Sequence, residues 1–278
     1  MEMKDGNNSL MATNSGSTIK KHFVLVHGAC HGAWCWYKLT PLLKLAGHRV
    51  TVLDLGASGI NPKQVNDLKS FSDYVDPLME FMENSVPSCI SIKHEERVIL
   101  VGHSLGGLVI SKAMETFAEK ISVAVFVTAL MPNILEEIKY PDIFKEVTGG
   151  DGIYTYDEGA KETPTTFMFG PSYLSSNLYE LSSPEDLALA SMLVRPVRVH
   201  SAEDMSKQMK MSKQKYGSVK RVYIICELDK AIPKDFQRLI IEKDSLNEVM
   251  EITGSDHMVM MSKPQELFAC LQEIAREA

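Results

Sequence analysis

The sequence predicts an α/β fold in which helices flank a mostly parallel central sheet and a cap is inserted into the chain. Three observations predict it. Short apolar segments alternate with helical segments along most of the chain, as in a parallel sheet that is covered on both faces. A Gly-x-Ser-x-Gly pentapeptide, residues 102–106, joins one apolar segment directly to one helix. Residues 130–218 interrupt the alternation with many prolines and glycines, which is typical of an inserted segment.

Six short apolar segments are predicted to be strands. Parallel strands that are buried on both faces are apolar along nearly their whole length, and these segments have that composition. The first of them reads HFVLVHG and ends in glycine, where a buried strand can turn. The predicted strands cover residues 22–28, 48–55, 97–103, 121–129, 221–227 and 248–252.

Helical segments follow most of these strands. In the first of them, Leu39, Leu42, Leu43 and Ala46 fall on one face, as expected for a helix that packs on a sheet. The predicted helices cover residues 37–46, 71–85, 105–117, 234–243 and 264–276.

The remaining segments define the expected organisation of the chain. Residues 1–20 are polar and lack the apolar core of a signal peptide, so we expect a disordered lead-in. Residues 21–278 are expected to form a single domain, with the cap inserted at about residues 130–218. No segment offers the roughly 18 apolar residues of a membrane span.

Composition limits the compartment and the partners. The five cysteines are odd in number and have no repeated spacing, which favours free thiols in a reducing compartment, so the cytoplasm is the expected location. The net charge of -7 disfavours non-specific binding to nucleic acid. We therefore expect a small-molecule partner, and neither nucleic acid nor a membrane.

The pentapeptide around Ser104 predicts a nucleophile. Its strand, RVILV, runs directly into it, and the helix LGGLVISKAMETF runs directly out. This is the setting of the nucleophile elbow of α/β-hydrolases, in which a strained turn projects the serine hydroxyl above the sheet. Gly102 and Gly106 allow the strand and the helix to approach without a Cβ clash. The helix N-terminus beside Ser104 favours the negative charge that develops during attack.

Two main-chain N–H groups are predicted to form an oxyanion hole. In this fold one belongs to the residue after the nucleophile, here Leu105, and the other to the loop after an early strand. That loop reads His27-Gly28-Ala29-Cys30. We predict that Ala29 is the second donor and that Gly28 gives room for the substrate.

A hydroxyl nucleophile needs a general base, and His257 is the predicted base. It follows the last strand and precedes the last helix, in a loop that opens at the same edge of the sheet as Ser104. Other histidines fit less well: His103 lies inside the elbow and faces the wrong way, and His94 and His200 do not follow a strand.

The base needs an orienting carboxylate, which in this fold precedes the histidine in the chain. Asp229 follows the predicted strand RVYIIC and is our choice, with Glu227 as the alternative. Asp256 is adjacent to His257, and neighbouring side chains on a loop diverge, so this carboxylate fits poorly.

Several long motifs resemble the plant methylesterase and hydroxynitrile lyase family, from about residue 21 to the C-terminus. The resemblance implies an α/β-hydrolase core with a cap, no metal and no organic cofactor. It also implies small substrates, such as methyl esters of jasmonate, salicylate or indole acetate, or alkaloid esters. The motifs are HFVLVHGACHGAWCWYKLTPLL, LDLGASGINP, VGHSLGG, SPEDLALASMLVRP, YGSVKRVYIICELDKAIP and GSDHMVMMSKPQEL.

Departures from the family's branches help to choose an activity. The hydroxynitrile lyases carry Thr and Lys where this chain has Gly28 and Met258, which disfavours cyanohydrin cleavage. The methylketone synthases resemble the chain around LDLGASGINPKQ and AMETF, but they have Ala in place of the nucleophile, which is Ser104 here. The cap lacks the Trp-containing stretch of the salicylate esterase and looks more like the caps of jasmonate esterases and methylketone synthases. The connection at residues 85–97 is longer than usual for the family.

The sequence thus predicts a serine esterase that cleaves a methyl or similar small alkyl ester of a plant metabolite through an acyl-enzyme. Two alternatives stay open: a ligand receptor on a hydrolase fold with little turnover, and a lyase or decarboxylase that acts on a cyanohydrin or a β-keto acid. Dimerising relatives make a homodimer plausible. Apart from Gly28, the residues predicted to contact substrate are Leu130, Phe144, Tyr154, Phe167, Phe169, Leu178 and Met258.

Overall fold

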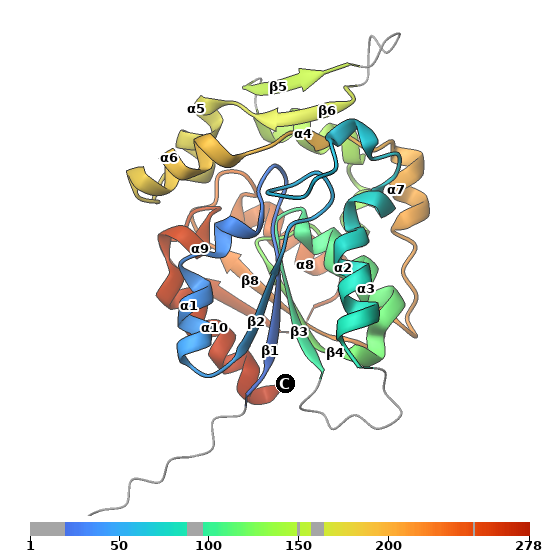
Figure 1. Ribbon diagram of the computed structural model, residues 1–278, viewed down its shortest axis with the longest axis vertical. Helices are drawn as coiled ribbons and strands as arrows, with labels where there is room; N and C mark the ends of the chain where they lie inside the picture. Colours follow the sequence, from blue (N-terminus) through green and yellow to red (C-terminus); the bar gives the residue numbers. More distant parts are fainter. Residues whose placement is uncertain (1–19, 88–96, 149–150, 157–163, 247) are drawn as a thin grey trace, which may run out of the picture.

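The computed structural model describes residues 20–87, 97–148, 151–156, 164–246 and 248–278 (Figure 1). The predicted disordered lead-in, apart from residue 20, lies outside the described residues. So does most of the long connection at residues 85–97.

A six-stranded parallel sheet forms the centre of the molecule, and its strand order is β2-β1-β3-β4-β8-β9. Three of the four inner strands, β1, β3 and β4, are almost completely buried, which explains their continuous apolar sequences. All six predicted strands are confirmed. Their bounds are β1 His22–Val26, β2 Arg49–Leu53, β3 Val98–His103, β4 Ile121–Val127, β8 Lys220–Cys226 and β9 Val249–Ile252.

Helices cover both faces of this sheet (Figure 1). α1 packs against α10 on one face, and α2 packs against α3 on the other. Ser70 caps the N-terminus of α2 by accepting a hydrogen bond from the N–H of Ser72, which explains why the helix begins there. The bounds are η1 Ala33–Trp36, α1 Leu39–Leu45, η2 Val65–Asp67, α2 Phe71–Ser85, α3 Gly106–Phe117, η4 Ala118–Lys120, η7 Tyr216–Ser218, α8 Lys234–Lys243, α9 Val259–Ser262 and α10 Pro264–Glu277.

Most of the segment at residues 130–218, which we call the cap, lies over the carboxyl ends of the strands, and its last residues run down beside α3 to the start of β8 (Figure 1). It contains a small antiparallel sheet, β5-β6-β7, that the sequence analysis did not predict, because its strands are short and lie among turn-forming residues. The elements are η5 Pro132–Glu136, α4 Tyr140–Thr148, β5 Gly152–Thr155, β6 Thr166–Phe169, α5 Pro171–Tyr173, η6 Leu174–Leu178, α6 Pro184–Leu193, β7 Val197–Arg198 and α7 Ala202–Gln208.

Two sets of polar contacts fasten the cap to the sheet domain. The buried carboxylate of Asp186, at the start of α6, accepts hydrogen bonds from the Lys38 ammonium at 2.5 Å and from the Tyr37 hydroxyl at 2.6 Å. The guanidinium of Arg195 donates three hydrogen bonds of 2.9, 2.9 and 3.0 Å to main-chain carbonyls of the loop after β2. These carbonyls belong to Gly59, Asn61 and Lys63.

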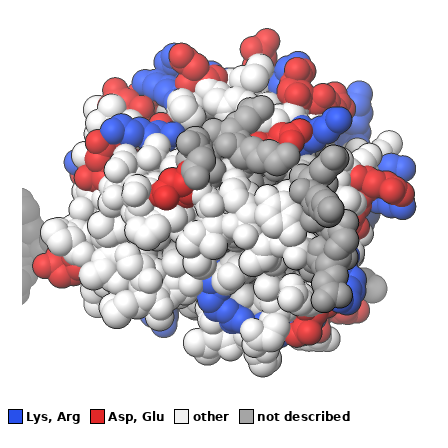
Figure 2. Space-filling view, turned by 90° about the horizontal axis from the view of Figure 1, so that it is seen from above, with Lys and Arg blue, Asp and Glu red and all other residues white. Residues whose placement is uncertain are grey.

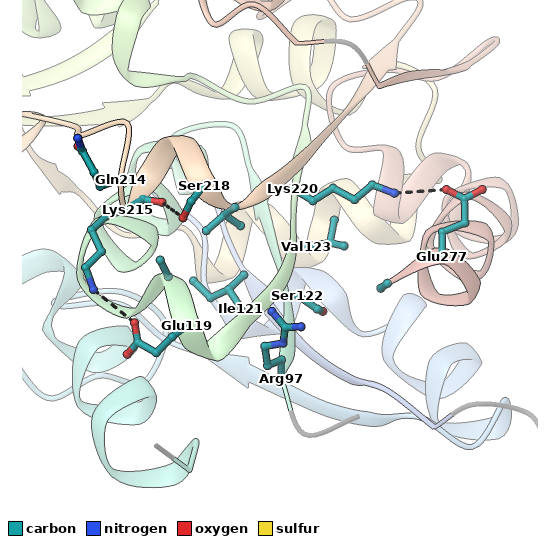
Figure 3. Close-up of a pocket in the computed structure, with 13 residues that line it drawn as sticks. Arg97, Glu119, Ile121, Ser122, Val123, Gln214, Lys215, Ser218, Lys220 and Glu277 are labelled. Atoms are coloured by element: carbon teal, nitrogen blue, oxygen red, sulfur yellow. Dashed lines mark hydrogen bonds and ion pairs between the residues drawn. The ribbon is translucent and has the colours of Figure 1, made fainter. Parts of the chain in front are cut away.

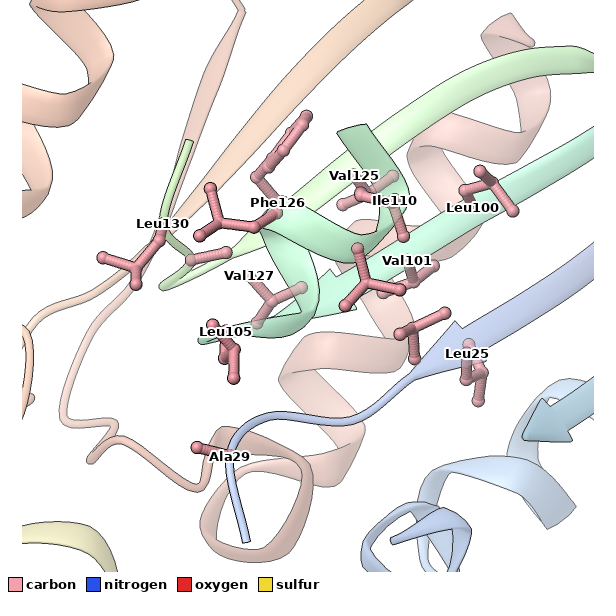
Figure 4. Packing of buried hydrophobic residues seen from close by; sticks show 14 of the residues in the cluster. Leu25, Ala29, Leu100, Val101, Leu105, Ile110, Val125, Phe126, Val127 and Leu130 are labelled. Carbon is pink, nitrogen blue, oxygen red and sulfur yellow. The ribbon is translucent and has the colours of Figure 1, made fainter. Parts of the chain in front are cut away.

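One hydrophobic core runs through the sheet and continues to the carboxyl ends of its strands. Figure 4 shows Leu100, Val101 and Val125 of the central strands packed in one cluster with Leu105 and Leu130, which lie where the strands end. The segments that directly follow β3 and β4 are therefore packed into the same apolar core. None of the helices in the described part of the chain is both long and apolar enough to cross a membrane.

Candidate active site

Ser104 lies in a sharp turn between β3 and α3, with a backbone φ of +54° that residues other than glycine rarely adopt. Its two flanking glycines are required by close packing. A Cβ on Gly102 would lie 2.6 Å from the carbonyl oxygen of Gly106, and a Cβ on Gly106 would lie 2.7 Å from that of His27. The predicted strand–turn–helix geometry is therefore present, with strain stored at the serine.

Three main-chain hydrogen bonds hold this strained turn. The N–H of Ser104 donates to the carbonyl of Val127, and the carbonyl of Ser104 accepts from the N–H groups of Gly107 and Leu130 at 3.1 and 3.0 Å. The turn is thus tied to the end of β4 and to the first residue of the cap. These ties fix the position from which the Ser104 hydroxyl projects.

His257 and Asp229 form a close pair, with 2.7 Å between Nδ1 of the imidazole and Oδ2 of the carboxylate. Because an ionised carboxylate only accepts hydrogen bonds, Nδ1 carries the ring proton and Nε2 keeps a free lone pair. An imidazole in this state can accept a proton from a hydroxyl at Nε2.

The Asp229 carboxylate is itself held by three further donors. Oδ1 accepts from the N–H groups of Ala231 and Ile232 at 2.7 and 2.8 Å. Oδ2 also accepts from the hydroxyl of Thr128, which directly follows β4. Sequence analysis missed Thr128, although its position at the end of a central strand was a signal that it lies near the site.

Ser104 and His257 line the same cavity, so the structure brings all three predicted triad residues together. No hydrogen bond joins the Ser104 hydroxyl to the imidazole in the described part of the chain. Catalytic hydrogen bonds are often long before substrate binds and shorten in the complex. The arrangement is therefore compatible with proton transfer from the serine to the histidine.

His103 is not part of the described cavity wall, and it supports the backbone of His257. Its Nε2 lies 2.8 Å from the main-chain carbonyl of His257, to which it donates, and the two ring centroids are 4.7 Å apart. Burial, together with the neighbouring His257, holds the pKa of His103 well below its ordinary value, so the ring stays neutral. His103 therefore anchors the backbone that carries the base.

The predicted oxyanion donors Ala29 and Leu105 both line the cavity beside Ser104. Among the described residues, no acceptor is paired with the N–H of either one. His27 helps to aim the first: its Nε2 accepts from the N–H of Leu55, so its Nδ1 carries the proton and donates to the carbonyl of Gly28 at 2.8 Å. The peptide is trans, so the N–H of Ala29 points away from His27. Two free amides of this kind can stabilise an oxyanion.

A glycine is needed at position 28 for a different reason from the one predicted. It is not part of the cavity wall, so it does not give room for the substrate. A Cβ on Gly28 would lie 2.8 Å from the Cβ of Ser104 and 3.1 Å from Nδ1 of His103, so the glycine lets the loop pack directly on the nucleophile. The threonine of the hydroxynitrile lyases would not fit here unless Ser104 or the loop moved.

The cavity beside Ser104 is lined almost entirely by apolar side chains. Three of the predicted contact residues, Leu130, Phe144 and Phe169, form part of its wall. Apart from Ser104 and His257, no wall residue that the structure describes has a polar side chain. The wall residues that sequence analysis missed are Ile143 of α4, Ala231 and Ile232 after Asp229, and Phe236 of α8.

The other predicted contact residues lie outside the wall. Phe167 is fully buried behind it, with its ring centroid 4.9 Å from those of both Phe144 and Phe169. The hydroxyl of Tyr154 donates to the carbonyl of Phe144. The side chains of Leu178 and Met258 are buried away from the cavity, and the Met258 N–H donates to the Leu178 carbonyl.

A model of the alpha/beta hydrolase family matches residues 23–269 of this sequence. The chain belongs to the alpha/beta hydrolase family. Methyl jasmonate esterase 1 of Vitis vinifera is 49% identical, over 92% of this chain and 97% of that protein. Salicylic acid-binding protein 2 of Nicotiana tabacum is 48% identical, over 92% and 98%. A crystal structure of a variant of tomato methylketone synthase I, complexed with β-ketoheptanoate, is 52% identical with a TM-score of 0.85, over 93% and 98%.

These similarities confirm the predicted fold class and the resemblance to the plant methylesterase and hydroxynitrile lyase family. Relatives that are named as esterases also bear out the expected enzyme class, a carboxylic ester hydrolase.

Buried neutral histidines make this alpha/beta hydrolase sensitive to acid. Burial lowers the pKa of His31 from 6.5 to about 3 and that of His200 to about 4. Below pH 6.5 the unfolded chain binds protons at these rings and the folded chain does not. The contribution of the two neutral rings to the free energy of unfolding is therefore fully present above pH 6.5 and is lost as the pH falls. Between pH 7.5 and 5.0, each ring should cost about 2 kcal/mol of unfolding free energy. Urea unfolding followed by tryptophan fluorescence measures this loss, and equal free energies at the two pH values would contradict it.

Another hollow of the hydrolase lies at the amino ends of β4 and β8 (Figure 3). Ser104 follows the carboxyl end of β3, so this hollow is at the opposite edge of the sheet. Its lysines are paired with carboxylates: Lys215 with Glu119 at 3.5 Å and Lys220 with Glu277 at 3.3 Å. It therefore offers no surplus positive charge from these lysines to an anionic ligand. Among the described residues, no group of three or more His, Cys, Asp or Glu could hold a metal ion.

Proposed function

We propose that this protein hydrolyses the methyl ester, or a similar small alkyl ester, of a small plant metabolite such as a hormone or an alkaloid, with Ser104 as nucleophile. One observation carries the proposal: Ser104, His257 and two unpaired N–H groups face one apolar cavity among the described residues, and Asp229 fixes the proton of His257 on Nδ1. The Vitis vinifera relative named methyl jasmonate esterase 1 supports a methyl ester as substrate.

The reaction follows from the positions of these groups. Nε2 of His257 takes the proton of Ser104 as Oγ attacks the ester carbonyl, and the N–H groups of Ala29 and Leu105 stabilise the oxyanion. When the intermediate collapses, His257 gives its proton to the departing alkoxide, which leaves as methanol. A water molecule then attacks the acyl-enzyme, with His257 as base, and releases the acid and free Ser104.

The cavity wall limits the acyl group. Because no described wall residue other than Ser104 and His257 has a polar side chain, a hydroxyl or ketone deep in the acyl group would find no side-chain partner there. Leaving such a group unpaired costs about 1–3 kcal/mol. On the face of the molecule over the cap, Figure 2 shows a broad area without Lys, Arg, Asp or Glu side chains. We therefore propose an uncharged substrate whose acyl group is mainly apolar.

A panel of methyl esters tests this proposal. Methyl heptanoate should be hydrolysed with a kcat/KM about 10- to 100-fold above that of methyl 7-hydroxyheptanoate, because the hydroxyl loses its hydrogen bonds in the cavity. Methyl jasmonate and methyl salicylate belong in the same panel, which is measured by release of methanol. Equal or better turnover of the hydroxylated ester would contradict the apolar acyl site. Absence of multiple turnover with every ester would favour the receptor alternative.

The similarity to tomato methylketone synthase I favours one second candidate, decarboxylation of a β-keto acid. The solved complex of that protein holds β-ketoheptanoate. Incubation of this chain with β-ketoheptanoate should then release 2-hexanone and carbon dioxide above the uncatalysed rate. Ester hydrolysis without this release would leave hydrolysis as the activity of the site.

A further inference from the structure

Five consecutive residues of the cap, Leu178 to Ser182, make contacts to three of the four segments that carry the proposed catalytic groups. We call residues 178–182 the clamp. The oxyanion loop is residues 27–31, the acid loop is residues 227–232, and the histidine loop is residues 254–258. One short segment of the cap therefore touches the loops of the predicted base, the predicted acid and the oxyanion donor Ala29, but not the nucleophile elbow.

The clamp holds the histidine loop through both main chain and side chains. The carbonyl of Leu178 accepts from the N–H of Met258 at 3.3 Å. The carboxylate of Asp256 accepts from the N–H of Leu181 at 2.9 Å and from the hydroxyl of Ser182 at 3.3 Å. Residues on both sides of His257 are thus tied to the cap.

The contact with the acid loop is weaker. Glu180 pairs with Lys230, the neighbour of Asp229, at 2.5 Å. The side chains of Lys230 and Glu180 are 51% and 38% exposed, so solvent screens the pair and it contributes little to stability.

The contact with the oxyanion loop passes through His31. The hydroxyl of Tyr179 lies 2.7 Å from Nε2 of His31, and Nδ1 of His31 lies 2.8 Å from the carbonyl of Ala29. The ring of His31 is stacked against those of Tyr179 and Trp34, with centroids 5.9 and 5.2 Å away. Burial holds the pKa of His31 at about 3, so its ring is neutral and has a single N–H.

The Ala29 carbonyl decides where that single proton lies, and the Tyr179 hydroxyl supplies a donor to the other ring nitrogen. A carbonyl oxygen can only accept, so the contact with Ala29 needs the proton on Nδ1, and Nε2 is then free to accept from Tyr179. His27 fixes the peptide before Ala29 through the Gly28 carbonyl, and His31 fixes the peptide after it. Ala29 is therefore held on both sides, and the second of these supports depends on the cap.

We propose that Tyr179 is a positioning residue that keeps the oxyanion hole in its working geometry through His31. The proposal rests on the function proposed above, because it assigns Tyr179 to the hole that Ala29 forms. It predicts that the cap contributes to the chemical step as well as to substrate binding.

Tyr179→Phe tests the proposal. Without the hydroxyl, the buried Nε2 of His31 is left without a donor, so the ring is no longer held at this end and its hydrogen bond to the Ala29 carbonyl is weakened. Complete loss of one oxyanion donor costs about 100- to 1000-fold in rate, so a loosened donor should lower kcat about 10- to 100-fold. KM should change less than about threefold, because the ground-state ester carries no oxyanion.

A pair of ketones separates this role from a merely structural one. 1,1,1-Trifluoro-2-octanone adds to a nucleophilic serine and forms a hemiketal oxyanion, whereas 2-octanone only occupies the cavity. Tyr179→Phe should weaken binding of the trifluoroketone by the same factor as kcat and leave binding of 2-octanone unchanged. Equal losses for both ketones, or an unchanged kcat, would overturn the proposal.

Tyr140→Phe is the matched control. Tyr140 is also a buried tyrosine of the cap, and its hydroxyl has no hydrogen-bond partner among the described residues. Its removal should leave kcat and trifluoroketone affinity within about twofold. A loss as large as that of Tyr179→Phe would assign the effect to cap packing and overturn the proposal.

Nitrogen NMR of the unmodified protein shows which ring nitrogen of His31 carries the proton, and no folding defect of a variant can obscure this test. The proposal requires the neutral ring of His31 to carry its proton on Nδ1 throughout pH 5–8, with His31→Gln serving to assign the signal. A proton on Nε2 would overturn it. Ester turnover and trifluoroketone addition by the unmodified protein test the proposed function separately, so the two failures are distinguishable.

Discussion

Ser104→Ala is expected to reduce ester turnover by about 10⁴- to 10⁶-fold, the largest effect of any single change in this protein. The substitution removes the oxygen that forms the acyl-enzyme and leaves the cavity and the oxyanion donors in place. Residual hydrolysis would come from the oxyanion hole and from substrate binding alone. The rate of methanol release from the best methyl ester of the panel measures the loss.

Ser111→Ala is the matched control for this prediction. Ser111 lies on the same helix, α3, and its buried hydroxyl donates to the carbonyl of Gly107 at 2.7 Å. Its removal should change kcat less than about threefold. A fluorophosphonate should add its mass to the peptide that contains Ser104 in the unmodified protein and in Ser111→Ala, but not in Ser104→Ala. Turnover by Ser104→Ala at more than about a tenth of the normal rate would exclude the acyl-enzyme mechanism.

Asp229→Asn is expected to lower kcat about 10⁴-fold, because the amide would reverse the hydrogen bond to His257. An asparagine has only one carbonyl oxygen. The N–H groups of Ala231 and Ile232 cannot turn away, so that oxygen must face them and the NH₂ group must face His257. Nδ1 of the imidazole then has to accept, its proton moves to Nε2, and the ring can no longer take the proton of Ser104.

Glu227→Gln provides the comparison, since Glu227 was the alternative acid. Its carboxylate accepts from the N–H of Gly254 at 2.9 Å, and no hydrogen bond links it to His257 among the described residues. Its substitution should lower kcat less than about tenfold. Measurements of kcat for both variants over pH 6–9 decide which carboxylate orients His257. A larger loss for Glu227→Gln than for Asp229→Asn would give the role of the acid to Glu227.

The sheet was predictable because its sequence signals are local. Strands that are buried on both faces must be apolar throughout, so β1, β3 and β4 stand out in the sequence. The position of each polar candidate relative to a strand end was enough to bring Ser104, Asp229 and His257 to one edge, since parallel strands share their carboxyl ends. Thr128 obeys the same rule and could have been found by it.

The cavity wall was not predictable in the same way. In an irregular cap, nothing local distinguishes an aromatic ring that faces the site from one that supports it, so Phe169 and Phe167 look alike in the sequence although only Phe169 lies in the wall. Phe236 lies in the cavity wall but was not predicted to contact substrate. It reads as an ordinary apolar residue of the amphipathic helix α8, and only the tertiary structure shows that the start of this helix faces the cavity.

The hydrogen bonds that hold the cap on the sheet domain affect how substrate enters the cavity and how product leaves it. A swing of the whole cap would break both hydrogen bonds to Asp186 and all three from Arg195 together. At about 1 kcal/mol for each of these five hydrogen bonds, a fully lifted form should be present in about one molecule in several thousand. Admission of reactant and departure of product must then depend on brief rotations of individual wall side chains such as Phe144 and Phe236. The opening that rotation of these rings creates, and not the amplitude of a cap movement, would then set the size of the largest substrate that can enter.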